Sequence, residues 1–244
     1  MNLMSLLTTP DAARAFVNEL IQVITLDDPR FGSFGLNELE SYYLQFQRVV
    51  DGFDVKVEEI NSIEQKNCRV EEIELHLLGQ KRTIRLPVAI VYHQTDQGLH
   101  IRLYYSNGPI DQTHQERSIL AANHGMTFPE PVANYQKAFA EGDLDATLAM
   151  FEPTATIQEP GGGIFGHSSD RSLKDFYTLI YSFGGGIGLE FCNAITNDKS
   201  CAIEYNCVKV GNNNYPPQAG VGIYNYRGHK LTGTRIYDDF VPSH

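Results

Sequence analysis

Two stretches that lie far apart in this sequence repeat one pattern of residues. Residues 91–107 (VYHQTDQGLHIRLYYSN) align with residues 223–239 (IYNYRGHKLTGTRIYDD) with little adjustment. Further upstream, residues 39–52 (LESYYLQFQRVVDG) align in the same way with residues 173–186 (LKDFYTLIYSFGGG). A unit made of a helix followed by a meander of strands is therefore used twice, and any fold for this chain has to contain it in both halves.

The spacing of apolar residues predicts the elements of each half. An apolar stripe at helical spacing predicts a helix over residues 11–25. The remaining elements of the first half are a helix over 37–50 and strands over 53–63, 69–78, 83–92 and 99–105. Those of the second half are helices over 131–141, from 144 onward and over 170–182, and strands over 155–159, 189–196, 200–210, 218–226 and 230–237.

One segment distinguishes the second half from the first. Residues 131–160 (PVANYQKAFAEGDLDATLAMFEPTATIQEP) give two helices and a short strand that ends in Glu159, just before Pro160. The corresponding connection of the first half, residues 27–36, has no room for a second long helix and a strand, and it carries no Glu-Pro pair. We therefore expect the first half to be a truncated copy with a structural role, and the second half to hold the site.

The composition argues against several classes of function. A net charge of −11 disfavours broad contact with a nucleic-acid backbone, which requires clustered lysine and arginine. No apolar stretch approaches the ~20 residues that span a bilayer, and the N-terminus lacks the features of a secretory signal. The sequence therefore predicts a cytoplasmic protein without membrane contact. The four cysteines lack the spacing of a zinc site, and we expect neither a metal nor a cofactor.

A known family resembles part of the second half. The residues from Tyr135 to Asp145, followed by Leu148-Ala-Met-Phe151 and Ile157-Gln-Glu-Pro160, resemble the opening of the NTF2-like superfamily. The resemblance is strongest to the branch that contains ketosteroid isomerases and SnoaL-like polyketide cyclases. It implies an α+β fold of two cone-shaped NTF2-like (cystatin-like) domains, each with helices packed on a curved antiparallel sheet.

The resemblance and the repeat together predict a domain organisation. Residues 1–108 form the truncated domain, residues 109–128 the linker, and residues 129–244 the complete domain. We expect the two domains to pack sheet to sheet as an internal pseudo-dimer, and two chains could pair further as a homodimer.

The resemblance also implies roles for particular residues. In the isomerases, a tyrosine on the first helix donates to the substrate oxyanion, and a carboxylate before a proline on the first strand moves a proton. Tyr135 and Glu159 occupy these positions. The second oxyanion donor of the isomerases is a carboxylic acid that an apolar site keeps neutral. Its position falls near Gly222, so this sequence departs from the pattern there.

Other residues of the second half are secondary candidates. By the same resemblance Asp238 could act as a base, and His167, which borders the loop after Glu159, could be a general acid or base. Arg235 could hold an anionic substrate, although the matching Arg102 of the first half favours a structural ion pair. The side chains expected to bind substrate are Phe165, Phe176, Tyr205, Tyr224 and Arg235.

Three classes of function fit these observations. The first is a cofactor-free enzyme of the isomerase, cyclase or epoxide hydrolase type that acts on a small apolar carbonyl or epoxide compound, with Glu159 moving the proton and Tyr135 polarising the oxygen. The second is a non-catalytic module that binds a small molecule or serves as a scaffold, which Gly222 and the shortened first half favour. The third is a protein-binding role through the faces of the sheets.

Overall fold

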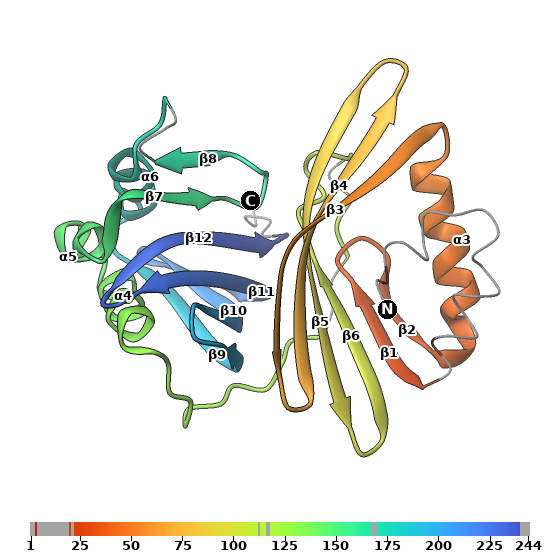
Figure 1. The fold of residues 1–244 in the computed structure, drawn as a ribbon, viewed down its shortest axis with the longest axis horizontal. Coiled ribbons are helices and arrows are strands. Elements are labelled where there is room, and N and C mark those ends of the chain that lie inside the picture. The colour runs from red at the N-terminus through yellow and green to blue at the C-terminus, as the bar shows by residue number, and fades with distance from the viewer. Residues whose placement is uncertain are drawn as a thin grey trace. The chain divides into compact units, whose positions relative to one another are not determined.

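The computed structural model describes residues 3, 20, 22–111, 113–115, 118–166 and 170–239 (Figure 1). The chain divides into two compact units: Met1–Ser62 with Lys66–Arg117, here called the first domain, and Ile63–Gln65 with Ser118–His244, the second domain. Each contains a six-stranded sheet and at least one helix. None of the helices in the described ranges is both long and apolar enough to cross a membrane.

The sheet of the first domain has the strand order β2-β1-β6-β5-β4-β3. Its strands are β1 (Val23–Asp28), β2 (Gly32–Gly35), β3 (Phe53–Gln65), β4 (Cys68–Gly79), β5 (Thr83–Thr95) and β6 (Gly98–Tyr104). A short 3₁₀ turn, η1 (Leu36–Glu38), leads into helix α3 (Leu39–Val50), which packs along one face of this sheet (Figure 1). Its apolar side chains recur at helical spacing and are buried against the strands: Leu39, Tyr42, Tyr43, Phe46 and Val50.

The sheet of the second domain has the strand order β8-β7-β12-β11-β10-β9. Its strands are β7 (Phe151–Gln158), β8 (Ile164–Gly166), β9 (Ile187–Thr196), β10 (Ser200–Val210), β11 (Asn213–Arg227) and β12 (Lys230–Asp238), and its helices are α4 (Glu130–Glu141), α5 (Leu144–Ala149) and α6 (Leu173–Tyr181).

Local sequence signals set the ends of these three helices. Helix α4 ends at Gly142, whose φ of 71° suits glycine. Asp143 then begins α5, because its side chain accepts a hydrogen bond from the Ala146 backbone N–H at 3.0 Å. Ser172 and Asp175 form a capping box at the start of α6. The breaks between these helices are therefore encoded locally.

The two sheets repeat one topology. In each domain the first strand pairs in parallel with the last, β1 with β6 and β7 with β12, so the sheets are mixed rather than purely antiparallel as expected. The same side-chain pair joins corresponding strands: Asn61 donates to Glu72 at 2.8 Å, and Asn193 donates to Glu204 at 3.0 Å. The α+β fold of two repeated domains, each with helices on a sheet, is confirmed.

The sheet of the first domain is not truncated, which corrects the expectation from the sequence. Residues 23–25, predicted as the end of a helix over 11–25, lie in strand β1 (Val23–Asp28). Residues 11–19 and 21 lie outside the described part of the chain. Val23 to Thr25 are three consecutive β-branched residues, which favour a strand, and pairing with β6 satisfies the backbone of this segment. Strands β1 and β2 therefore stand where β7 and β8 stand in the second domain.

Candidate functional site

The strand registers show which residues of the two domains correspond. Strand β1 pairs with β6 so that Asp27 lies opposite Arg102. Strand β7 pairs with β12 so that Gln158 lies opposite Arg235. Because the two arginines already align in the sequence repeat, Asp27 corresponds to Gln158, and the residues that follow them correspond as well.

The first domain therefore carries an acid–proline pair at the end of its first strand, where none was expected. Asp28-Pro29 stands in the place of Glu159-Pro160 of the second domain. The sequence contains a signal that could have revealed it, since each pair lies a similar number of residues before its matching arginine. The pair was not recognised because it follows the helix predicted over residues 11–25, where a proline is also a common helix-stop signal.

Asp28 is fully buried and accepts four hydrogen bonds. Its Oδ1 accepts from the backbone N–H of Arg30 at 2.8 Å, from that of Phe31 at 3.1 Å and from the Tyr105 hydroxyl at 2.8 Å. Its Oδ2 accepts from the Tyr42 hydroxyl at 3.0 Å. Residues from the segment after β1, from α3 and from the end of β6 thus converge on one carboxylate.

Burial dominates the acid–base behaviour of this group. Desolvation raises the pKa of the Asp28 carboxyl, and the hydrogen bonds from Arg30, Tyr105, Tyr42 and Phe31 offset only part of that effect. Burial also raises the pKa of the phenols of Tyr42 and Tyr105 well above the ordinary value, so both remain neutral donors. Asp28 is therefore a carboxylate that takes up a proton more readily than one in water.

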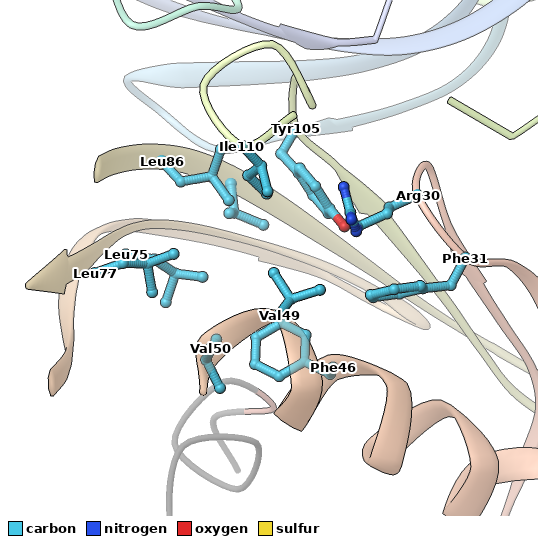
Figure 2. A pocket seen from close by; sticks show the side chains of 11 residues that line it. Arg30, Phe31, Phe46, Val49, Val50, Leu75, Leu77, Leu86, Tyr105 and Ile110 are labelled. Atoms are coloured by element: carbon cyan, nitrogen blue, oxygen red, sulfur yellow. The ribbon is translucent and has the colours of Figure 1, made fainter. Parts of the chain in front are cut away.

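A small apolar cavity lies in the same domain (Figure 2). Its volume of about 10 Å³ leaves room for about one water molecule. The side chains that line it come from α3, β4 and β5 and from the segments after β1 and β6: Phe46, Val49, Val50, Leu75, Leu77, Leu86, Val88, Arg30, Phe31, Tyr105 and Ile110. Figure 2 shows Arg30 and Tyr105 close together on one side of the cavity, with the side chains of α3 facing them.

Tyr105 connects the cavity to the buried acid. Its ring forms part of the cavity wall, and its hydroxyl donates to Asp28. Arg30 supplies the positive charge at the same wall, and its guanidinium pairs with both carboxylate oxygens of Asp111. The first domain thus brings together an acid, a phenol, a cation and an apolar space.

In the second domain, the two leading candidates contact different partners. The Glu159 carboxylate is half-buried and accepts a hydrogen bond from the Gly163 backbone N–H at 3.2 Å, across the glycine-rich turn after β7. The Tyr135 hydroxyl is buried and accepts from the Tyr177 hydroxyl at 3.1 Å, while its ring stacks on Phe139. Among the described residues no hydrogen bond joins Glu159 to Tyr135, and their joint role stays a prediction.

The secondary candidates are placed as follows. Asp238 accepts a hydrogen bond from the Tyr205 hydroxyl at 3.1 Å. Phe165 packs against Phe176 with ring centroids 4.8 Å apart. Arg235 is half-buried on β12. His167 lies outside the described residues. The roles of all of these in substrate binding or catalysis stay predictions.

Position 222, where the resemblance implies a second donor, is covered by a phenol. A Cβ atom added to Gly222 would lie 2.5 Å from the Tyr224 hydroxyl oxygen. The Tyr224 ring is buried and packs against the Tyr135 ring at 5.5 Å. Glycine at this position therefore leaves room for Tyr224 in the core.

We expect Gly222→Ala to lower the free energy of unfolding by about 1–3 kcal/mol, because the added methyl group overpacks the core against Tyr224. Urea denaturation measures this loss. Gly35→Ala is the matched control, since its added Cβ would meet only the Glu38 side chain, at 3.6 Å, and φ there is −85°. Equal stability of the Gly222 variant and the wild type would contradict this view of the second-domain core.

One group of described side chains has the composition of a metal site. Ligand atoms of Glu58, Glu74 and His76 lie within 4.8 Å of one another. Both oxygens of Glu74, however, accept hydrogen bonds from Arg85, at 2.8 and 2.9 Å. A cation would have to displace this guanidinium, so the group is better described as an ion-pair network.

No protein-family model matches this chain, and no curated protein matches it. Many solved structures are similar to parts of it, and three of them serve as examples. A hypothetical protein with a ketosteroid isomerase-like fold from Catenulispora acidiphila, in complex with trimethylamine, is 16% identical, with a TM-score of 0.39; the match covers 46% of this chain and 88% of that one. A putative polyketide cyclase from Sinorhizobium meliloti is 14% identical over 45% of this chain and 94% of that one, with a TM-score of 0.37. An LEH-like epoxide hydrolase from M. tuberculosis is 15% identical, with a TM-score of 0.36; the match covers 44% of this chain and 80% of that one. Similarity at this level identifies neither a ligand nor a reaction for this chain.

Proposed function

We propose that the first domain binds a small apolar molecule beside Asp28 and carries out cofactor-free acid–base chemistry on it, of the isomerase, cyclase or hydrolase type. The observation that carries this proposal is a fully buried acid, with a raised pKa, linked to an apolar cavity by one hydrogen bond from Tyr105. Catalytic acids and bases are characteristically held in such environments.

The geometry gives each side chain a role. A ligand larger than a water molecule would have to displace side chains that line the cavity. It would then lie beside Tyr105, whose hydroxyl donates its proton toward Asp28. A proton leaving the ligand would pass to the Tyr105 oxygen as the phenol proton moves to the Asp28 carboxylate. The charge that remains on the ligand would lie near the Arg30 guanidinium, which lines the same wall. The proton returns by the reverse route, so no co-reactant is needed for an isomerisation.

A second candidate function is non-catalytic binding of the same class of molecule. Both oxygens of Asp28 already accept hydrogen bonds, four in all. A buried acid that is fully satisfied in this way also suits a purely structural role. A third candidate is the one predicted from the sequence, in which Glu159 moves the proton and Tyr135 polarises the oxygen in the second domain. The experiment below tests it together with the other two.

The test begins with a thermal-shift screen of apolar ketones, lactones and epoxides, followed by a turnover assay on each compound that stabilises the protein. We expect Asp28→Asn to reduce turnover by about 100-fold or more, because it removes the proton acceptor. Tyr105→Phe should act in the same direction. Glu159→Gln, the matched change in the second domain, should leave turnover intact.

Each outcome of this comparison separates the candidates. Full turnover by a folded Asp28→Asn protein would refute the proposed role of Asp28. Ligand binding without turnover by the wild-type protein would favour the non-catalytic module. Loss of turnover in Glu159→Gln alone would place the chemistry in the second domain.

A further inference from the structure

Arg30 is an unusual side chain for the wall of an apolar cavity. Its side chain is only 12% exposed. The two terminal nitrogens donate to the two carboxylate oxygens of Asp111, with Nη2–Oδ2 at 2.7 Å. Its Nε is buried and, among the described residues, has no hydrogen-bond partner. One donor of a charged side chain that lines the cavity is therefore left without an acceptor, which is costly in a native structure.

The carboxylate that Arg30 holds comes from the segment after β6. The backbone N–H groups of Ile110 and Asp111 both donate to the Asn107 carbonyl, at 3.0 and 3.1 Å. After this turn the Ile110 side chain lines the cavity (Figure 2). The carboxylate of the next residue, Asp111, pairs with Arg30. Two consecutive residues thus present a branched apolar group and a carboxylate to the same site.

The Asp111 carboxylate also accepts a hydrogen bond from the Thr113 backbone N–H at 3.1 Å, but it lies near the surface. The Asp111 side chain is 48% exposed, so water and salt screen its ion pair with Arg30. A carboxylate that reached Arg30 from within the cavity would be shielded from water and could also accept from the unpaired Nε. A ligand with both parts could therefore replace Ile110 and Asp111, and the space that Ile110 leaves would enlarge the cavity of about 10 Å³.

We propose that the ligand of the first domain is a small branched-chain carboxylic acid, bound with its carboxylate on Arg30 and its apolar body in the place of Ile110. Ile110 and Asp111 are then an internal stand-in for this ligand. The inference rests on the proposed function in that it uses the same cavity. It changes the description of the ligand from a wholly apolar molecule to one with an apolar body and a single charged group, the carboxylate that pairs with Arg30.

The test is calorimetric titration of the full-length protein with 4-methylpentanoate and with its neutral analogue, 4-methylpentanamide. We expect the wild-type protein to bind the acid about tenfold or more tightly than the amide, because only the acid forms a charge-assisted pair with Arg30. Asp111→Asn should tighten binding of the acid by about two- to fivefold, because it removes a competing surface ion pair. Arg30→Gln should abolish the preference for the acid.

A matched control is available in the same domain. Arg85→Gln breaks another bidentate pair with a glutamate, on an exposed side chain outside the cavity lining, and should leave binding unchanged. Equal affinity for acid and amide, or no tightening in Asp111→Asn, would overturn the proposal. Misfolding would weaken binding, so it cannot explain tighter binding by Asp111→Asn. This expected gain therefore distinguishes the proposal from a general loss of structure in Arg30→Gln. Because only binding is measured, a failure of the acid–base chemistry at Asp28 would not alter this outcome.

Discussion

Asp28→Ala is expected to destabilise the first domain by about 3 kcal/mol or more, which would be a large part of the stability of a domain of this size. The substitution leaves four donors without their acceptor: the buried hydroxyls of Tyr42 and Tyr105 and the partly buried backbone N–H groups of Arg30 and Phe31. Urea denaturation followed by circular dichroism measures the loss.

Glu159→Ala is the matched control for this prediction, because Glu159 stands at the corresponding place in the second domain. It is half-buried, and its carboxylate accepts a hydrogen bond from the Gly163 backbone N–H at a relatively long 3.2 Å. We expect a loss below about 1 kcal/mol. Similar losses for the two variants would contradict the burial and the four accepted hydrogen bonds that distinguish Asp28 from Glu159.

The pH dependence of the Asp28→Ala effect has a definite sign. The pKa of Asp28 is raised above its ordinary value of 3.8, chiefly by burial, so the folded state binds this proton more tightly than the unfolded state. The contribution of Asp28 to stability is therefore fully present below 3.8 and declines as the pH rises through the folded-state pKa. The difference between wild type and variant should be larger at about pH 4 than at about pH 8.

Gly186→Ala is expected to destabilise the second domain by about 3 kcal/mol or more. A Cβ atom at this position would overlap the backbone carbonyl oxygens of Phe139 and Ala140, in the last turn of α4. Backbone cannot turn aside as a side chain can, so α4 would have to move away from the start of β9. Thermal unfolding should show a markedly lower midpoint for this variant.

Gly228→Ala separates this steric effect from backbone strain. Gly228 has a φ of +58°, and a Cβ added there would meet nothing within 4 Å. It should cost only about 1–2 kcal/mol, the strain of a left-handed residue. A Gly186 variant as stable as this control would contradict the close approach of α4 to β9.

Several features of the fold could be predicted from the sequence. The aligned stretches 91–107 and 223–239 predict a duplicated unit, and the structure contains it as two sheets with one strand order. The meander strands and the helix before them are encoded by local patterns of apolar and turn residues. These predictions hold because the apolar side chains that the spacing places on one face of an element are the ones that pack in the core.

The first strand of the first domain could not be predicted in this way. Residues 11–25 carry an apolar stripe at helical spacing, yet Val23 to Asp28 form strand β1. The deciding contact is parallel pairing with β6, which lies more than seventy residues downstream at Val23↔Leu99 and Asp27↔Arg102. Local propensity is a weak prior, and such distant pairing overrides it.

The sequence by itself determined the repeated architecture and predicted Glu159-Pro160 at the end of a strand, whereas the strand registers identified Asp28-Pro29 as the corresponding pair. Only the tertiary structure decided which acid is buried. Asp28 is enclosed because Tyr42 from α3 and Tyr105 after β6 converge on it, whereas the Glu159 carboxylate accepts a hydrogen bond from its own glycine-rich turn. The elements that bury Asp28 lie far apart in the chain. Their burial of the carboxylate raises its pKa, and the hydrogen bonds that they donate offset only part of that effect.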